Sequence, residues 1–171
     1  MHPKKFAFVL LLVLSLGHPI AQASDLLGSS EETVSVWAKE KGYTVNDSNR
    51  GTSGCLAGKR YVEMSKGDLK VYAIFFQPIY QEQSQKVTLV MFQPASAASQ
   101  GQAHQWAVQV APIVGTRPGT QKQKIEAGSG ICGAPNGGFE ERYTGDFLVE
   151  YQYGAGGSGI DRLFVSNEGI R

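Results

Sequence analysis

The chain has 171 residues, with 16 Lys or Arg, 15 Asp or Glu and 3 His, so its formal net charge is +1. A near-neutral chain without a basic cluster has no positive surface that would attract the phosphates of nucleic acid. No block of like charge indicates a membrane-surface helix. Composition therefore argues against DNA or RNA as a partner and leaves other classes open.

The N-terminus has the pattern of a cleaved secretory signal peptide. A positive segment with Lys4 and Lys5 precedes an apolar run over residues 6–16, and a small-x-small cleavage site ends at Ala23. The apolar run is shorter than the roughly 20 residues that a membrane-spanning helix needs. We therefore expect a signal peptide over residues 1–23, and a protein that is periplasmic or secreted and has no stable membrane anchor.

Cleavage after Ala23 would leave a single exported domain, residues 24–171. It would also remove two of the three histidines and two lysines, which changes the formal charge from +1 to −1. The only cysteines, Cys55 and Cys132, both lie in glycine-rich segments of this domain. Because an even cysteine count in an oxidising compartment favours pairing, we expect a Cys55–Cys132 disulfide. Two free thiols, one of them a nucleophile, are the alternative.

The first predicted element of the exported domain is an amphipathic helix over residues 30–41. Ser29 is the expected N-cap, Glu32 completes a capping-box pattern, and Gly42 is placed as the C-terminal cap. The apolar residues at helical spacing are Val34, Trp37 and Ala38. This is the only helix that the pattern supports directly, and the polar residues 46–54 are expected to form a loop.

From residue 60 onward the pattern is typical of strands, with β-branched and aromatic residues bounded by glycines and prolines. Residues 105–114 alternate Trp106, Val108 and Val110 with polar or small residues, which favours a half-buried strand, with a helix as the alternative. Other expected strands cover residues 60–65, 69–77, 86–93, 122–127, 139–143, 146–153 and 160–166. The fold prediction is α+β: a single domain with one N-terminal helix packed on an antiparallel sheet of about six strands, and one disulfide.

Residues 71–78 and 87–94 share a weak similarity, with four of eight positions identical. One such echo does not make a repeat architecture, which needs several copies. We attribute it to shared strand chemistry.

The glycine-rich segment 154–159 matches the spacing G-x-G-x-x-G. In a dinucleotide site this motif opens a helix, with a second strand and an acidic residue about 20 positions later. Here the motif precedes a predicted strand close to the end of the chain, so we expect a hairpin loop and no nucleotide cofactor.

Catalytic and metal-binding equipment is sparse. After cleavage His104 is the only histidine, placed in a polar loop, and no serine lies in a nucleophile elbow. One histidine and two cysteines cannot build a zinc site, so no metal or other cofactor is expected. Glu140 and Glu141 are adjacent and would face opposite sides of a strand, whereas Glu63 and Glu150 could meet across the sheet. A carboxylate-dependent hydrolase is therefore a minor alternative.

Binding is the function that remains, and we do not expect an enzyme. The favoured hypothesis is an exported inhibitor or immunity-type protein that docks on a protein partner such as a cell-wall hydrolase. The expected partner-binding residues surround the glycine-rich loop: Tyr151, Tyr153, Gly156, Gly157, Ser158, Asp161 and Arg162. The alternative is an envelope protein that binds a small molecule or glycan on aromatic residues, Tyr61, Tyr72, Phe76 and Trp106.

Overall fold

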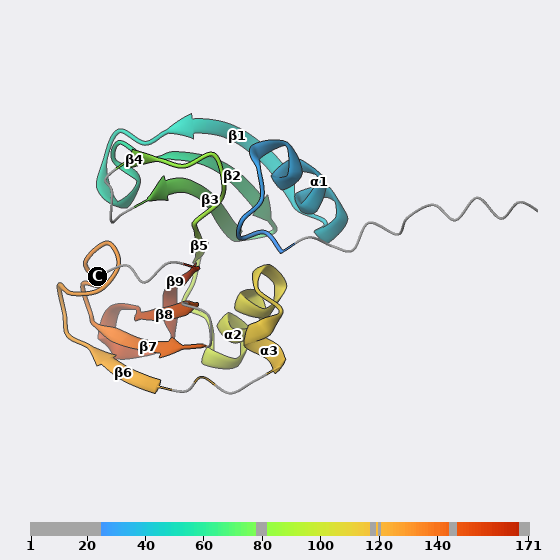
Figure 1. Ribbon diagram of the computed structural model, residues 1–171. Coiled ribbons are helices and arrows are strands. Elements are labelled where there is room, and N and C mark those ends of the chain that lie inside the picture. The colour runs from blue at the N-terminus through green and yellow to red at the C-terminus, as the bar shows by residue number, and fades with distance from the viewer. Residues whose placement is uncertain (1–24, 78–81, 117–118, 120, 144–146, 168–171) are drawn as a thin grey trace, which may run out of the picture.

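The computed structural model describes residues 25–77, 82–116, 119, 121–143 and 147–167, and the predicted signal peptide lies outside these residues. They form one antiparallel sheet of nine strands (Figure 1). Eight strands follow one another in the order β1-β2-β3-β5-β9-β8-β7-β6, and β4 pairs with β3 off this path. The elements in chain order are α1 (Glu31–Lys41), β1 (Thr44–Arg50), β2 (Arg60–Lys66), β3 (Leu69–Gln77), β4 (Glu82–Gln83), β5 (Leu89–Pro94), α2 (Gln100–Val110), α3 (Ile113–Thr116), β6 (Gln121–Ile125), β7 (Gly138–Arg142), β8 (Leu148–Tyr153) and β9 (Ile160–Ser166).

The predicted architecture is confirmed in outline and wrong in its counts. Helices on an antiparallel sheet and a Cys55–Cys132 disulfide are present, as expected. The sheet has more strands than the expected six or so, and the described residues contain three helices, not one. No helix in this described part is long and apolar enough to cross a membrane.

Helix α1 lies where the pattern placed it, with a different cap. Ser30, not Ser29, is the N-cap, and its hydroxyl accepts a hydrogen bond from the Thr33 N–H. Ser29 is buried instead and donates to the Asp25 carbonyl at 2.8 Å. Gly42 ends the helix in the left-handed region, with φ of 74°, which glycine adopts at little cost.

Strand β1 replaces much of the loop expected over residues 46–54. Every residue of β1 is exposed, and the strand forms an edge of the sheet paired only with β2. An exposed edge strand carries no alternation of apolar and polar residues. The polar sequence of this segment therefore gave no strand signal.

Helix α2 corrects the strand expected over residues 105–114. Ser99 is its N-cap and accepts from the Gln102 N–H at 3.2 Å. The buried residues follow helical spacing, namely Ala103, Trp106, Ala107 and Val110. His104 consequently lies on this helix and not in a polar loop. The apparent alternation of Trp106, Val108 and Val110 arises because Val108 is itself partly buried.

The two halves of the chain repeat one arrangement, a helix followed by four sheet strands. The first half is α1-β1-β2-β3-β5 and the second is α2-β6-β7-β8-β9. The last strand of each half, β5 or β9, lies at the centre of the sheet and pairs antiparallel with the other, with Met91 opposite Phe164. An approximate twofold axis through this pair relates the halves. The weak sequence similarity between residues 71–78 and 87–94 relates the neighbouring strands β3 and β5, so it does not reflect this symmetry.

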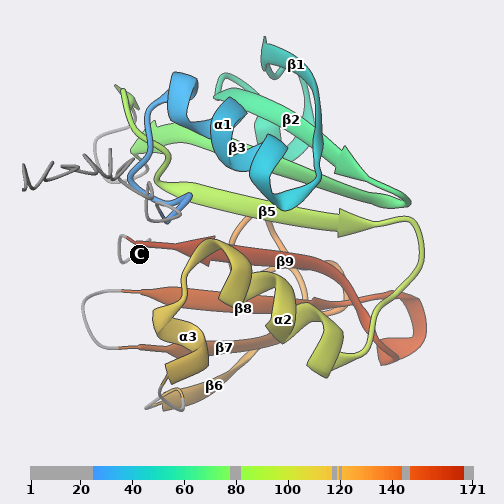
Figure 2. The ribbon, with the colours of Figure 1, turned by 90° about the vertical axis from the view of Figure 1, so that its right-hand side faces the viewer.

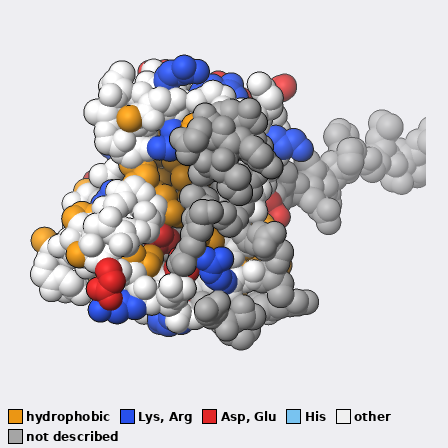
Figure 3. Space-filling model, turned by 60° about the vertical axis from the view of Figure 1, so that its left-hand side comes forward, with side chains coloured by type: hydrophobic (Ala, Val, Ile, Leu, Met, Phe, Trp, Pro, Cys, Tyr) orange, Lys and Arg blue, Asp and Glu red, His pale blue; other side chains and the backbone are white. Residues whose placement is uncertain are grey.

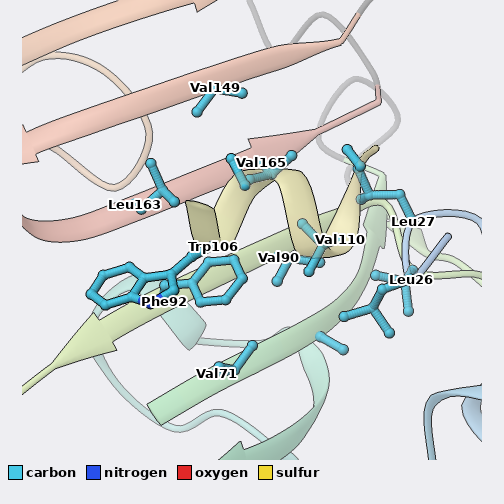
Figure 4. Close-up of a cluster of buried hydrophobic side chains, with 14 of the residues drawn as sticks. Leu26, Leu27, Val71, Val90, Phe92, Trp106, Val110, Val149, Leu163 and Val165 are labelled. Atoms are coloured by element: carbon cyan, nitrogen blue, oxygen red, sulfur yellow. The ribbon is translucent and has the colours of Figure 1, made fainter. Parts of the chain in front are cut away.

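Both long helices pack on one side of the sheet, which we call the helix face (Figure 2). Trp37 of α1 and Trp106 of α2 occupy the same position relative to their N-caps and are both buried. Between the helices, Leu26 and Leu27 lie beside Val90 and Val110 (Figure 4). Residues from both halves therefore share one core on this face.

The opposite side of the sheet, the disulfide face, carries a second and smaller core. Its central residues are Tyr72, Ile74, Leu89, Met91, Leu148 and Phe164. The loops that contain Cys55 and Cys132 fold over this face, and their Cα atoms are 5.0 Å apart. These loops are the β1–β2 and β6–β7 connections, which occupy corresponding places in the two halves. The disulfide thus joins equivalent loops close to the twofold axis.

Candidate functional site

The glycine-rich loop, residues 154–159, connects β8 to β9 at the end of the sheet where β5 also ends (Figure 2). The Gly154 N–H donates to the Gly159 carbonyl at 3.1 Å, and the Gly157 N–H donates to the Gly154 carbonyl at 3.0 Å. Residues 155–158 are exposed. The loop is therefore a compact turn, closed at its base, that projects from the sheet.

The glycines of this turn serve different purposes. Gly156 and Gly157 have φ of 79° and 70°, and a Cβ atom on either would meet nothing within 4 Å. Gly159 also has a positive φ, but a Cβ there would lie 2.9 Å from the Cβ of Ala97. The positive φ explains why positions 156 and 157 are glycine, whereas at Gly159 the close approach of Ala97 excludes a side chain as well. The tip of the turn is thus free of side-chain contacts.

The base of the turn is fixed to the connection between β5 and α2. The Ala98 N–H donates to the Ile160 carbonyl at 2.8 Å, and the Ile160 N–H returns a bond to the Ala98 carbonyl at 2.7 Å. We call residues 94–98 and 154–159 together the ridge. A hollow lies on each side of it, and Pro94 lines both.

On the disulfide face, the hollow beside the ridge has a volume of about 450 Å³ and includes Asp161 and Arg162. The Oδ1 atom of Asp161 is shielded from solvent and has no hydrogen-bond partner in the described part of the chain. Burial raises the pKa of this carboxyl, although the Arg162 guanidinium and nearby backbone N–H groups lower it. An unpaired buried acceptor costs about 1–3 kcal/mol. A donor from a bound molecule would remove that cost.

The predicted partner-binding residues do not all share this surface. Gly156, Gly157 and Ser158 lie at the exposed turn, and Asp161 and Arg162 line the neighbouring hollow. Tyr151 and Tyr153, the two tyrosines of β8, lie elsewhere.

Tyr151 is completely buried and stacks on Phe139 with ring centroids 4.5 Å apart. It faces the helix-face core and cannot act as a surface anchor, so its place in the predicted set is corrected. Tyr153 is half-buried and contributes to a separate pocket of about 480 Å³ near Lys122. The aromatic anchors expected from the sequence are therefore directed away from the ridge.

The hydroxyl of Tyr151 has a polar environment beneath α2. It lies 3.2 Å from Nδ1 of His104 and 3.5 Å from Oε2 of Glu141, which also accepts from the Tyr143 hydroxyl at 2.9 Å. Burial raises the pKa values of Tyr143 and Tyr151, so both remain protonated donors. His104 is thus part of a chain of hydrogen bonds that ties α2 to β7 and β8.

The carboxylates proposed for a hydrolase do not meet. Glu63 and Glu150 are four strand spacings apart along the sheet, which is about 19 Å. Glu150 instead lies directly opposite Glu140, and both are buried on the disulfide face. That arrangement brings together two carboxylates that sequence spacing did not connect.

The contacts of Glu150 indicate an anchoring role. Its carboxylate accepts from the Ile131 N–H at 2.9 Å and from Nε2 of Gln152 at 2.7 Å. Burial raises the pKa of Glu150, while these two hydrogen bonds lower it. Because Ile131 precedes Cys132, the carboxylate holds the disulfide loop against the sheet. The described residues contain no group of three or more side chains suited to hold a metal ion.

The disulfide loops border a cleft of about 630 Å³, lined in part by Lys59, Phe76 and Cys132. Figure 3 shows hydrophobic side chains at the bottom of a hollow on this side of the molecule. Lys59 donates to the Cys55 carbonyl at 2.6 Å and lies over the Phe76 ring, and burial lowers the pKa of its ammonium. Tyr61 and Tyr72 contact each other edge to face on the same side of the sheet. Trp106, the fourth aromatic residue expected in a ligand site, packs on the helix face.

Comparisons with protein-family models, with curated proteins and with solved structures found no match to this chain. Its function is therefore inferred from the geometry of its own residues. Two surfaces offer binding chemistry: the ridge with the neighbouring hollow that contains the unpaired Asp161 oxygen, and the aromatic cleft beside the disulfide.

Proposed function

We propose that the protein is exported, is periplasmic or secreted, and acts as an inhibitor or immunity-type protein that docks the ridge on a protein partner, such as a cell-wall hydrolase. The observation that carries this proposal is the Oδ1 atom of Asp161, buried without a partner among the described residues at the foot of an exposed turn. Two other buried acceptors among the described residues also lack a partner, Oε1 of Gln152 and Oδ1 of Asn167, but Asp161 is the one that lines the hollow beside the exposed turn. A partner that donates to this atom would satisfy it.

The shape of the ridge supports docking into a groove. Residues 155–158 are exposed and carry only small side chains, so the turn is narrow. Its base is held by hydrogen bonds to Ala98, so little conformational freedom is lost on binding. The hollows on both sides give side chains of a partner places to enter.

Ser158→Trp tests this proposal without straining the fold. Ser158 is exposed and has φ of −106° and ψ of 124°, a conformation that any L-residue adopts, unlike those of the neighbouring glycines. The matched control is Ser35→Trp, on the exposed side of α1. Tagged wild-type and variant proteins would be incubated with envelope extract of the source organism, and retained proteins quantified by mass spectrometry.

We expect one partner to be retained stoichiometrically by the wild type and by Ser35→Trp, and at least tenfold less by Ser158→Trp. Circular dichroism and thermal unfolding of the two variants should match the wild type. Equal retention by Ser158→Trp would remove the glycine-rich turn from the proposal. Turnover of peptidoglycan or polysaccharide by the purified protein would contradict the binding role itself.

A second candidate, binding of a small molecule or glycan, is supported by the aromatic cleft on the disulfide face. Tyr61, Tyr72 and Phe76 lie on this face, beside the cleft of about 630 Å³. Phe76→Ala would weaken such binding, whereas Ser158→Trp would leave it intact. Titration with peptidoglycan fragments, followed by tyrosine and tryptophan fluorescence, separates the two candidates.

A further inference from the structure

The segments that precede α1 and α2 are equivalent under the approximate twofold axis. Before α1, the Gly28 N–H donates to the Val87 carbonyl at 2.8 Å, and the Val87 N–H donates to the Ser29 carbonyl at 2.9 Å. Before α2, Ala98 and Ile160 exchange the same kind of hydrogen bonds. Val87 lies just before β5 and Ile160 begins β9. The chain therefore enters both helices along corresponding paths, at opposite ends of the sheet.

The side chains on these paths differ in size. Leu26 and Leu27 are 0% and 7% exposed, and they pack beside Val90 and Val110 in the helix-face core (Figure 4). Counting back from the two N-caps, the corresponding residues before α2 are Ala95 and Ser96, and both are exposed. Where one half places two isobutyl groups in the core, the other half places a methyl and a hydroxymethyl group at the surface.

A pocket of about 430 Å³ occupies this second position. Its exposed lining is more polar than apolar, with Leu69, Pro94 and Trp106 among the residues that supply the apolar part. Tyr43 and Gln109 also line it, joined by a hydrogen bond of 3.0 Å from the tyrosine hydroxyl to Oε1. The pocket is the counterpart of a site that the chain itself fills with leucine at the other end.

We propose that this pocket, which we call the leucine pocket, binds a branched aliphatic side chain from a peptide segment of the docking partner. The chemistry follows from the filled counterpart, where two leucines occupy the corresponding place in the chain and pack in the helix-face core. Lys66 and Asp68 also line the pocket and provide a donor and an acceptor for a peptide backbone. The identity of the partner rests on the proposed function, because residues 94–98 line the pocket and also belong to the ridge. The binding of an aliphatic side chain by the pocket does not rest on it.

A blocked dipeptide, N-acetyl-Leu-Leu-amide, tests the pocket directly. The readout is the indole N–H resonance of Trp106 in NMR spectra of the exported domain, with Trp37 in the other half as an internal control. We expect the Trp106 resonance to shift at millimolar peptide, the Trp37 resonance to stay in place, and N-acetyl-Ala-Ser-amide to have no effect. No Trp106 shift, or equal shifts of both indoles, would overturn the proposal.

The double substitution A95L/S96L restores the leucines found in the other half. We expect it to weaken dipeptide binding at least tenfold without lowering the Tm, because the added side chains occupy space that is already open. Dipeptide binding that persists in A95L/S96L, or a Tm lowered by the substitution, would show that the leucine pocket is not the vacant counterpart of the leucine site.

These experiments distinguish failure of the docking proposal from failure of the leucine-pocket proposal. If Ser158→Trp loses the partner and A95L/S96L retains it, the glycine-rich turn binds the partner and the leucine pocket does not. If the wild type retains no partner but the dipeptide shifts Trp106, the leucine pocket binds peptide and the docking role is contradicted. Loss of the partner by both variants supports both proposals.

Discussion

Removing the disulfide should cost this fold a large part of its stability. The bond closes a loop with a sequence separation of 77 residues. In the chain-entropy model a loop of this length stabilises the folded state by about 4.5 kcal/mol, and loss of native disulfides typically costs 2–5 kcal/mol. We therefore expect the double substitution C55S/C132S to lower the free energy of unfolding by about 4 kcal/mol.

Urea unfolding followed by tryptophan fluorescence measures this loss, because Trp37 and Trp106 are buried, one in each half of the chain. For a domain of this size, about 4 kcal/mol corresponds to a Tm decrease of roughly 8–16 °C. The reduced wild-type protein provides the matched control and should unfold like C55S/C132S. A decrease of less than about 1 kcal/mol in both samples would refute the reasoning. It would mean that the sheet and Glu150 hold the two loops without the bond.

Two further predictions concern the N-terminal leucines and the buried carboxylate. A protein that begins at Gly28 should be less stable than one that begins at Ser24, because Leu26 and Leu27 are in the core. The difference should be at least the 2–5 kcal/mol typical of one buried leucine, and equal urea midpoints would contradict this. Burial raises the pKa of Glu150, so the Glu150 carboxyl binds a proton more readily in the folded protein than in the unfolded chain. The ionised carboxylate therefore destabilises the fold at neutral pH, and this penalty is relieved as the pH falls toward 4.5. The stability of E150Q relative to wild type should therefore decrease from neutral pH to about pH 4.5 in urea titrations, and a difference independent of pH would contradict the assignment.

The sequence was most informative for strands at the middle of the sheet, which are buried on both faces and therefore form nearly continuous apolar runs. Residues 69–77 and 160–166 were predicted with the boundaries that β3 and β9 show, because both strands are rich in buried apolar residues. β1 was missed because all of its residues are exposed, and its pairing with β2 is made by the backbone. For α2, the alanines of its buried face carry a weak hydrophobic signal, and Val108 imitated a strand alternation.

The sequence alone predicted where the candidate site lies along the chain, but not which of its side chains reach the surface. Glycine content located the turn at residues 154–159, but residues 148–152 of β8 are buried on both faces of the sheet, so no alternation indicates which way each side chain points. Tyr151 therefore appeared to be an anchor although it is buried. The leucine pocket required knowledge that the two halves are equivalent. One signal was present, since Ser30 and Ser99 precede tryptophans at the same spacing, Trp37 and Trp106.

The approximate symmetry also separates residues that maintain the fold from residues available for binding. Both halves keep the serine cap, the buried tryptophan, and a cysteine on the loop over the disulfide face. They differ at the connection before the last strand, which contains β4 in one half and the exposed glycine-rich turn in the other. They differ again before the helix, where leucines in one half correspond to Ala95 and Ser96 in the other.

Both differences between the halves lie at the same end of the sheet, on the ridge. A chain under pressure only to fold has no reason to leave a pocket open and a turn exposed at one site, when the opposite end shows that leucine can fill the corresponding space. The coincidence therefore favours the ridge over the disulfide face as the binding surface. Opening the counterpart site with L26A/L27S should destabilise the protein without changing partner retention, whereas A95L/S96L should change retention without destabilising it. If L26A/L27S alone reduced partner retention, the assignment of binding to the ridge would be wrong.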